Sequence, residues 1–516
     1  MRLINRHQEL ASEKSIMLFF RGFISTALLC YLFFNKAWAQ DYFVFNQYDI
    51  VAPFNISQAP LSANLLPNYG NELILIGEKN GDHKLALFAW TEDSQSYQML
   101  RQVDLPKTFF SFDLGEVDAD GLQSLYFLTS NQVMQFKPTA DEFYQPILDV
   151  QSIYINSHAH YLRQADFVVD INKDGLADVV LADFAHLNVY IQQSNTQFIA
   201  QKIPISPTVE IFDGSVSYTE KPYYFVDMTM DNLQDIVLSG DGELQVYVQQ
   251  KQGKFDLNGK SISINPSITG VNWWDTRGAD GQNLDQSNLK HRTIEHLIDI
   301  NNDNLPDMVV QYTQSSGVLD KSNDYEIYLA SVVKGELVYP AQASSLVKAQ
   351  GTLTDLDFID IDNDAQKEIM TSSFDISVSQ IISALLTGSV DQDVLIYALN
   401  SDNEYQTKIS KEVELTFNLT SGKSGSPVIK MTDLNGDGVK DLVLSSSEQK
   451  LSVYPGKAKG NLLHKKAQKL AVKLPKNGAL LSSEDLDQDG RSELLVRYSL
   501  EDGEDMQSRL LVVKVE

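Results

Sequence analysis

A nine-residue acidic pattern recurs along this 516-residue chain and limits what it can fold into. The pattern has Asp at its first and fifth positions, Asp or Asn at the third, Gly at the sixth and Asp or Glu at the ninth, as in Asp433–Asp441. Each copy precedes a short apolar run, such as Val179-Val180-Leu181, that is typical of a β-strand. A strand-forming unit that recurs in this way indicates one repeat architecture rather than several unrelated domains.

Seven copies of the pattern begin at residues 116, 170, 227, 299, 360, 433 and 485. Asn304 and Ala365 replace the glycine in two of them, and Asn is the milder change because it tolerates positive φ better. The copy at 227 has Thr229 at its third position, and the copy at 116 ends in Ser124. These two copies are the weakest.

The chemistry that needs this spacing is calcium binding. Ca²⁺ takes six to eight oxygen ligands in a flexible shell. Side chains at positions 1, 3, 5 and 9 and the backbone carbonyl of position 7 supply such oxygens. The residues expected to bind calcium are Asp170, Asn172, Asp174, Leu176 and Asp178; Asp299, Asn301, Asp303, Leu305 and Asp307; Asp360, Asp362, Asp364, Gln366 and Glu368; Asp433, Asn435, Asp437, Val439 and Asp441; Asp485, Asp487, Asp489, Arg491 and Glu493; Asp227, Asp231 and Asp235; and Glu116, Asp118 and Asp120.

Two other interpretations of the pattern were weighed. An EF-hand shares the 1, 3, 5 start but needs a Glu at position 12, where this chain has Leu181 and Val496, and it needs flanking helices. The EF-hand is therefore rejected. Ordinary Asx-turns, whose side chains bond only to their own backbone, are the other alternative. Several carboxylates crowded on one frame repel each other without a cation, which favours calcium.

The spacing of the copies predicts an all-β propeller. Intervals of 52 to 73 residues suit a four-stranded blade with insertions. An eighth unit without metal precedes the seven, with strands at 72–76 and 85–90 after a degenerate loop at 64–72. The last unit lacks a fourth strand, which residues 42–48 would supply to close the ring. We therefore expect eight four-stranded blades, with seven as the alternative.

The repeated loop ahead of an apolar strand resembles the FG-GAP repeat of integrin α chains and its bacterial VCBS relatives. The resemblance covers nearly all of residues 41–516. It implies a propeller whose calcium loops join the first and second strands on one face, with four to seven Ca²⁺ ions and a ligand on the opposite face. The sequence departs from the family at Thr229, Ser124 and the 64–72 loop.

The first 39 residues predict a secretory signal. An apolar run at 22–34 is too short to span a bilayer comfortably and is followed by Ala37-Trp38-Ala39, a cleavage pattern. Met17 is a candidate true start, and an uncleaved anchor is the alternative. The predicted domains are thus a signal at 1–39 and a single propeller at 40–516, secreted or periplasmic. Its one cysteine, Cys30, lies in the signal, so no disulfide or thiolate site is expected in the mature chain.

The formal net charge of −28 argues against nucleic acid and anionic membranes as partners. We expect a monomer that binds a glycan or a protein. Long connections near 266–292, 313–324 and 374–393 belong to neighbouring blades on the face away from the calcium loops. Trp273, Trp274, Asp275 and Arg277 are the candidate ligand-binding residues, although packing of the two tryptophans onto the ring explains them equally simply.

Three functions remain open from the sequence. The leading one is a non-catalytic binding scaffold. The second is a calcium-dependent enzyme that resembles propeller polysaccharide lyases, for which His158, His160, Tyr161 and Arg277 are possible parts. The third is a structural surface component that associates with itself. No catalytic residues are assigned.

Overall fold

The computed structural model describes residues 42–516 apart from 68, 118–120, 152–161, 195–196, 206–207, 213–214, 220, 241, 266–267, 269–288, 318–319, 350–351, 375–386 and 419–422. The predicted signal at 1–39 lies outside these residues. The chain divides into two compact units, Met1–Val44 and Phe45–Glu516. The second unit is described below. Among the described residues, no helix has the length and apolar character needed to span a membrane.

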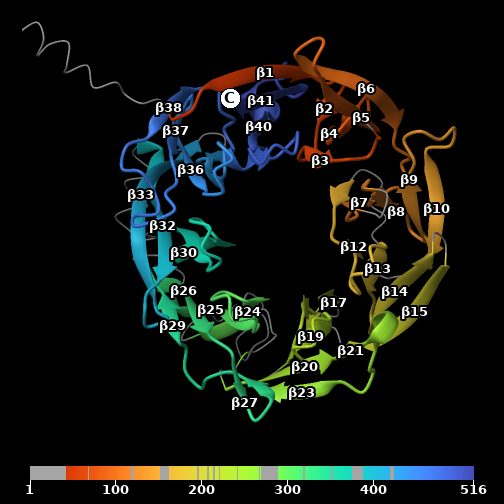
Figure 1. Ribbon diagram of the computed structural model, residues 1–516, viewed down its shortest axis with the longest axis vertical. Coiled ribbons are helices and arrows are strands. Elements are labelled where there is room, and N and C mark those ends of the chain that lie inside the picture. The colour runs from red at the N-terminus through yellow and green to blue at the C-terminus, as the bar shows by residue number, and fades with distance from the viewer. Residues whose placement is uncertain are drawn as a thin grey trace, which may run out of the picture. The chain divides into compact units, whose positions relative to one another are not determined.

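The unit Phe45–Glu516 is a β-propeller of eight sheets that follow one another around a ring (Figure 1). From the centre outward, blade 1 contains β3 (Leu61–Ala63), β4 (Glu72–Lys79), β5 (Asp82–Thr91) and β6 (Ser96–Asp104), and β2 (Asn55–Ile56) also pairs with β4. Blade 2 contains β7 (Ser111–Leu114), β8 (Leu125–Leu128), β9 (Gln132–Phe136) and β10 (Tyr144–Asp149), and β11 (Arg163–Gln164) runs parallel to β7. Blade 3 contains β12 (Val168–Val169), β13 (Asp178–Ala182), β14 (His186–Ser194) and β15 (Gln197–Pro204), and blade 4 contains β18 (Tyr223–Val226), β19 (Asp235–Gly240), β20 (Glu243–Tyr247) and β23 (Lys260–Ser263). Blade 5 contains β24 (Leu289–Ile298), β25 (Asp307–Gly317), β26 (Asp320–Tyr328) and β29 (Ser345–Val347). Blade 6 contains β30 (Thr352–Ile359), β31 (Glu368–Phe374), β32 (Ser389–Leu399) and β33 (Tyr405–Asn418), and β34 (Lys423–Gly425) extends it. Blade 7 contains β35 (Ile429–Thr432), β36 (Asp441–Ser447), β37 (Lys450–Tyr454) and β38 (Gln468–Ala471), and blade 8 contains β39 (Leu481–Glu484), β40 (Glu493–Arg497), β41 (Arg509–Val515) and β1 (Phe45–Val51). The prediction of eight four-stranded blades is confirmed.

Short elements decorate the ring. Three two-stranded hairpins are formed by β16 (Thr208–Phe212) with β17 (Ser215–Thr219), β21 (Gln249–Gln250) with β22 (Lys254–Phe255), and β27 (Ser331–Val333) with β28 (Glu336–Val338). Within the described ranges, the single-turn 3₁₀ helices are η1 (Lys251–Gly253), η3 (Gly478–Leu480) and η4 (Leu500–Asp502).

Blade 8 contains strands from opposite ends of the unit. Strand β1 pairs antiparallel with β41 from Phe45 opposite Val515 to Val51 opposite Arg509. The strand was expected at 42–48 and runs instead from Phe45 to Val51. Pairing the first strand with the last removes two free sheet edges at once.

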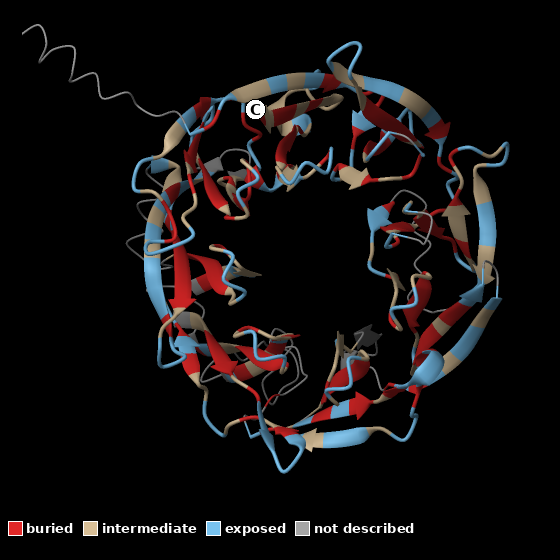
Figure 2. Cartoon of the chain, viewed as in Figure 1, coloured by how far each residue is buried: buried red, intermediate tan, exposed pale blue. Residues whose placement is uncertain are grey.

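The core lies between successive blades. The second strands are buried along their apolar residues, as in β13 and β19, because a neighbouring blade covers each face. One apolar cluster, for example, joins Val180 and Val189 of blade 3 to Ile236 and Tyr247 of blade 4. Figure 2 shows buried residues within the sheets and many exposed residues along the outer strands. The loops at the strand ends are therefore held on a rigid frame.

Candidate metal centre

The seven predicted calcium loops occupy the same place in blades 2 to 8, between the first and second strands. Because each sheet is antiparallel and every blade runs outward from the centre, these connections all emerge at one end of the strands. Six complete loops are described, 170–178, 227–235, 299–307, 360–368, 433–441 and 485–493, and are called the acidic loops. In the copy at 116, Glu116 is described, whereas Asp118 and Asp120 lie outside the described residues.

The six acidic loops share one backbone conformation. The sixth position has positive φ in all of them, at Gly175, Asn232, Asn304, Ala365, Gly438 and Gly490. The fourth position does too, at Lys173, Met230, Asn302, Asn363, Gly436 and Gln488. The sequence predicted the sixth position but not the fourth, because three of the six residues found there, Lys173, Met230 and Gln488, have no preference for positive φ.

Carboxylates at positions 1 and 5 hold this backbone in place. In the first acidic loop, Asp170 accepts hydrogen bonds from the N–H groups of Asp174 at 3.0 Å and Gly175 at 2.8 Å. Asp174 accepts one from Leu176 at 2.9 Å. The other acidic loops repeat most of these bonds. Asx-type turn bonds are therefore present, and they leave lone pairs on the carboxylates for a cation.

The ninth residue is a buried acid. Asp307 is fully buried and accepts N–H bonds from Ile300 at 3.0 Å and Ala330 at 2.8 Å. The second bond comes from just beyond the third strand, and Asp178, Asp235 and Asp441 receive the same pair. Burial raises the pKa of Asp307 to about 7, with smaller contributions from Asp303 and Asp299. The ninth residue thus anchors the loop to its own sheet, a role that the sequence did not reveal.

The third residue differs among the acidic loops: it is Asn in three of them, Asp in two and Thr in the loop at 227–235. Where it is Asn, its side-chain N–H donates to the carboxylate of position 5, as Asn172 does to Asp174 at 3.0 Å. Asn301 and Asn435 do the same. An ionised Asp has no such proton to donate. The loops with Asp362 and Asp487 therefore need a positive charge from elsewhere.

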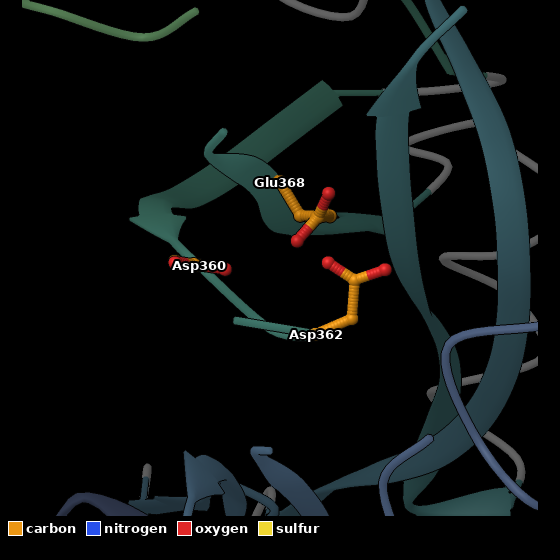
Figure 3. Close-up of side chains that lie close together, drawn as sticks. All are labelled: Asp360, Asp362 and Glu368. Atoms are coloured by element: carbon orange, nitrogen blue, oxygen red, sulfur yellow. The ribbon is translucent and has the colours of Figure 1, made fainter. Parts of the chain in front are cut away.

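The loop at 360–368 gathers three carboxylates. Asp360, Asp362 and Glu368 each have an oxygen within 4.8 Å of the others, and Figure 3 shows the carboxylates of Asp362 and Glu368 facing each other. The buried Oδ1 of Asp362 has no hydrogen-bond partner. Burial raises the pKa of Glu368 to about 7, and burial with the neighbouring Asp364 and Asp360 raises that of Asp362. This oxygen-only, under-neutralised set fits a hard cation such as Ca²⁺.

The loop at 485–493 forms the second such cluster, from Asp485, Asp487 and Glu493. Here a lysine is present. The ammonium of Lys514, on β41, contacts Asp487 and lies 3.7 Å from Asp489 Oδ2 and 3.7 Å from Glu493 Oε1. The two clusters are thus alike in their acids and differ in their cations.

Neighbouring loops are hydrogen-bonded to one another in a chain that we call the loop girdle. The N–H of Lys367 donates to Ile300 O at 2.9 Å, and that of Lys440 donates to Ile361 O at 2.8 Å. Four further junctions have such a bond. Two are between backbones, where the N–H of Gln123 donates to Asn64 O and that of Ser492 donates to Asp433 O. In the other two, the side-chain amide of Gln249 donates to Ile171 O and that of Asn71 donates to Asp485 O. Among the described residues, the girdle thus joins six of the eight pairs of successive blades at this rim.

A repeated tyrosine escaped the sequence analysis. The residue opposite position 10, near the end of the third strand, is Tyr190, Tyr247, Tyr328, Tyr397 or Tyr454 in five blades. Three of these, Tyr247, Tyr328 and Tyr397, are buried. A Val or Ile stands directly before each of these tyrosines, as in Val189-Tyr190, so this pair is a sequence signal for the third strand.

The predicted ligand face cannot be built from side chains. Trp273, Trp274, Asp275 and Arg277 lie outside the described residues, as do His158, His160 and Tyr161. Their flanking strands are described. The connections from β23 to β24, from β25 to β26 and from β31 to β32 all leave the sheets at the end away from the acidic loops.

Comparison with known proteins identifies no family. No protein-family model and no curated protein matches the sequence. Among solved structures, BBS1N in complex with ARL6DN aligns at 10% identity and a TM-score of 0.35 over 91% of this chain and 96% of that one. An Agrocybe aegerita lectin that recognises non-reducing terminal N-acetylglucosamine aligns at 13% identity and a TM-score of 0.38, over 82% of this chain and 94% of that one. A Lactobacillus plantarum protein aligns at 9% identity and a TM-score of 0.36, over 81% of this chain and 97% of that one. Alignments of this identity and TM-score carry no information about ligand or activity.

Proposed function

We propose that this protein is an exported propeller of the FG-GAP/VCBS type that uses calcium to stabilise one face and binds a glycan or a protein with the other, without catalysis. The observation that carries the proposal is the cluster of Asp360, Asp362 and Glu368, whose oxygens converge within 4.8 Å with no cationic side chain among the described residues that contact them.

Calcium is the ion that suits these loops. Their ligands are carboxylate, amide and carbonyl oxygens on a flexible nine-residue frame, which matches the preference of Ca²⁺ for six to eight oxygens and its tolerance of irregular geometry. Mg²⁺ demands a near-ideal octahedron and dehydrates reluctantly. The loop at 360–368 has the greatest uncompensated charge and would fill first. The loops with Asn at position 3 would fill next, because their acids are already partly satisfied.

The opposite face is the better place for a ligand. On the acidic-loop face, the loop girdle ties most of the connections to a neighbouring blade and restricts their movement. The other face carries the long connections at 266–288 and 375–388, and variable connections on a rigid frame are where binding residues concentrate. Trp273, Trp274, Asp275 and Arg277 belong to the first of these and are the proposed contacts.

The proposal is tested in three measurements on the purified mature chain. Metal analysis after dialysis against calcium should find bound Ca²⁺, and EDTA should lower the melting temperature, because a ligand that binds only the folded state stabilises it by mass action. A glycan array in calcium should give hits that Trp273→Ala and Trp274→Ala remove. Unsaturated products released from acidic polysaccharides would instead support an enzyme, and a melt unchanged by EDTA would remove the calcium assignment.

Export is tested separately. Full-length chain expressed with its first 39 residues should appear outside the cytoplasm with a new N-terminus near Gln40, as the Ala37-Trp38-Ala39 pattern predicts. Retention of residues 1–39 on the mature protein would contradict cleavage.

A further inference from the structure

The closing blade carries a lysine whose ammonium lies against its acidic loop. Lys514 contacts the carboxylate of Asp487, and its side chain is 23% exposed. Glu493 is 1% exposed, and its Oε1 has no hydrogen-bond partner and faces this ammonium at 3.7 Å. The ammonium therefore lies among the side chains that the loop would use to bind a metal.

The register of the sheets puts a lysine at this position in blades 8 and 2 and a neutral residue in the other six blades. Lys514 follows Val513, which pairs with Leu494, the tenth position of the loop pattern. The corresponding residues in six other blades are neutral, namely Ala89, Ile191, Val248, Leu329, Ala398 and Pro455. In blade 2, Lys137 follows the third strand, and the loop it would face includes Asp118 and Asp120, outside the described residues.

A second cation belongs to the same loop. Arg491, at the seventh position, has its Nε 3.9 Å from Asp489 Oδ2. The other seven blades have a neutral residue at this position, as with Leu305, Gln366 and Val439. Lys514 and Arg491 together bring two positive charges to the loop, which is the charge of one Ca²⁺ ion.

We propose that Lys514, assisted by Arg491, is a built-in counter-ion that takes the place of calcium in the loop at 485–493. The inference rests on the proposed function in that the other acidic loops are taken to bind calcium. An ammonium among Asp487, Asp489 and Glu493 offsets part of their negative charge and obstructs the site for a divalent ion. Blade 8, in which β1 meets β41, is then stable without metal, whereas blade 6 depends on it.

The reason for such a device lies in the position of blade 8. Its sheet joins strands from the two ends of the unit, so its formation completes the ring. A loop that depended on calcium here would make closure of the ring depend on calcium as well. A lysine carried on β41 delivers the charge when that strand pairs, because the ammonium arrives with the strand itself.

The test is the variant Lys514→Met, which keeps most of the apolar stem and removes the charge. Purified in calcium and dialysed, the variant should bind one more Ca²⁺ per chain than the unaltered protein, measured by metal analysis. In EDTA it should melt at a lower temperature than the unaltered protein, and saturating calcium should restore most of the difference. The exposed lysine of β37, changed as Lys450→Met, is the matched control and should change neither quantity.

A second substitution separates the outcomes. Asp487→Asn puts Asn at the third position of the loop, as Asn172, Asn301 and Asn435 are in their loops, where the amide donates to the carboxylate of position 5. The double variant Lys514→Met/Asp487→Asn should therefore be more stable in EDTA than Lys514→Met alone. An unchanged calcium count together with an unchanged melt in Lys514→Met would overturn the inference. If the unaltered protein binds no calcium at all, the calcium proposal fails. A lower melting temperature of Lys514→Met in EDTA, restored by adding Asp487→Asn, would still support the role of Lys514 as a counter-ion.

Discussion

Replacing Glu368 by Gln should change the stability of the protein in opposite directions with and without calcium. Glu368 is buried, and its Oε2 accepts the N–H of Ile361 at 2.9 Å. Gln keeps an acceptor for that bond, and its amide can donate to the Asp362 oxygen that has no hydrogen-bond partner. The substitution thus removes a charge with little change of shape.

The magnitude follows from the pKa of Glu368, which burial raises from 4.5 to about 7. A raised folded-state pKa means that the folded state binds more protons than the unfolded state between these two values. Without metal, the carboxylate therefore costs the fold nothing well below pH 4.5 and progressively more as pH rises towards 7 and beyond. Each pKa unit corresponds to about 1.4 kcal/mol, so the full cost at pH 8 is roughly 3 kcal/mol.

The assay is thermal melting in EDTA and in saturating calcium, at pH 8 and pH 5. In EDTA at pH 8, Glu368→Gln should melt at a higher temperature than the unaltered protein, and most of this advantage should vanish at pH 5. In calcium at pH 8, the order should reverse, because the ion favours the ionised carboxylate and a neutral ligand binds it less well. A variant less stable than the unaltered protein in EDTA at pH 8 would refute the reasoning.

Three further predictions concern the frame around the loops. Ala365→Gly should stabilise the protein by about 1 kcal/mol in urea melts, because Ala365 has a φ of 71° that an L-residue adopts at a cost; a loss of stability would contradict this. Asp307→Asn should destabilise it by about 2 kcal/mol in the same melts, because Asn cannot accept two N–H bonds with two oxygens, and an unchanged midpoint would argue against the anchoring role. Deleting 45–51 should leave the outer edge of β41 unpaired. The melting temperature should then fall, and light scattering should detect concentration-dependent association through the free edge. A monomer with an unchanged melting temperature would show that this pairing contributes little.

The sequence predicted the blades because their determinants are local. The acidic pattern and the apolar run after it lie within a dozen residues, so each blade could be recognised without its neighbours. The register of β1 could not be predicted, because it depends on β41 at the other end of the unit, and the strand begins at Phe45 rather than Tyr42. Positive φ at Lys173 and Gln488 was also missed, because turn bonds to the preceding carboxylates impose a conformation that these side chains do not favour.

The chemistry of the individual loops needed the structure. All the acidic loops look alike in sequence. The structure shows that Asn172 donates a hydrogen bond to Asp174, whereas Asp362 has an oxygen with no hydrogen-bond partner, and this difference in charge balance is not evident from the pattern. Lys514 lies far beyond its loop in the chain, and only the pairing of β40 with β41 brings it to Asp487. Burial of the ninth residue could be expected from the apolar strand that follows, but its second N–H donor could not.

The loop girdle limits where the chain can be lengthened. The loop at 360–368 contacts both of its neighbours, through Lys367 to Ile300 and through Lys440 to Ile361, so residues added within it would break two junctions at once. The residues that stretch the spacing from 52 to 73 lie in connections outside the nine-residue loops, such as 266–288, 375–388 and the connection that holds β27 and β28. The connection at 375–388 leaves its sheet at the end away from the girdle, which makes it a natural point for grafting a foreign peptide.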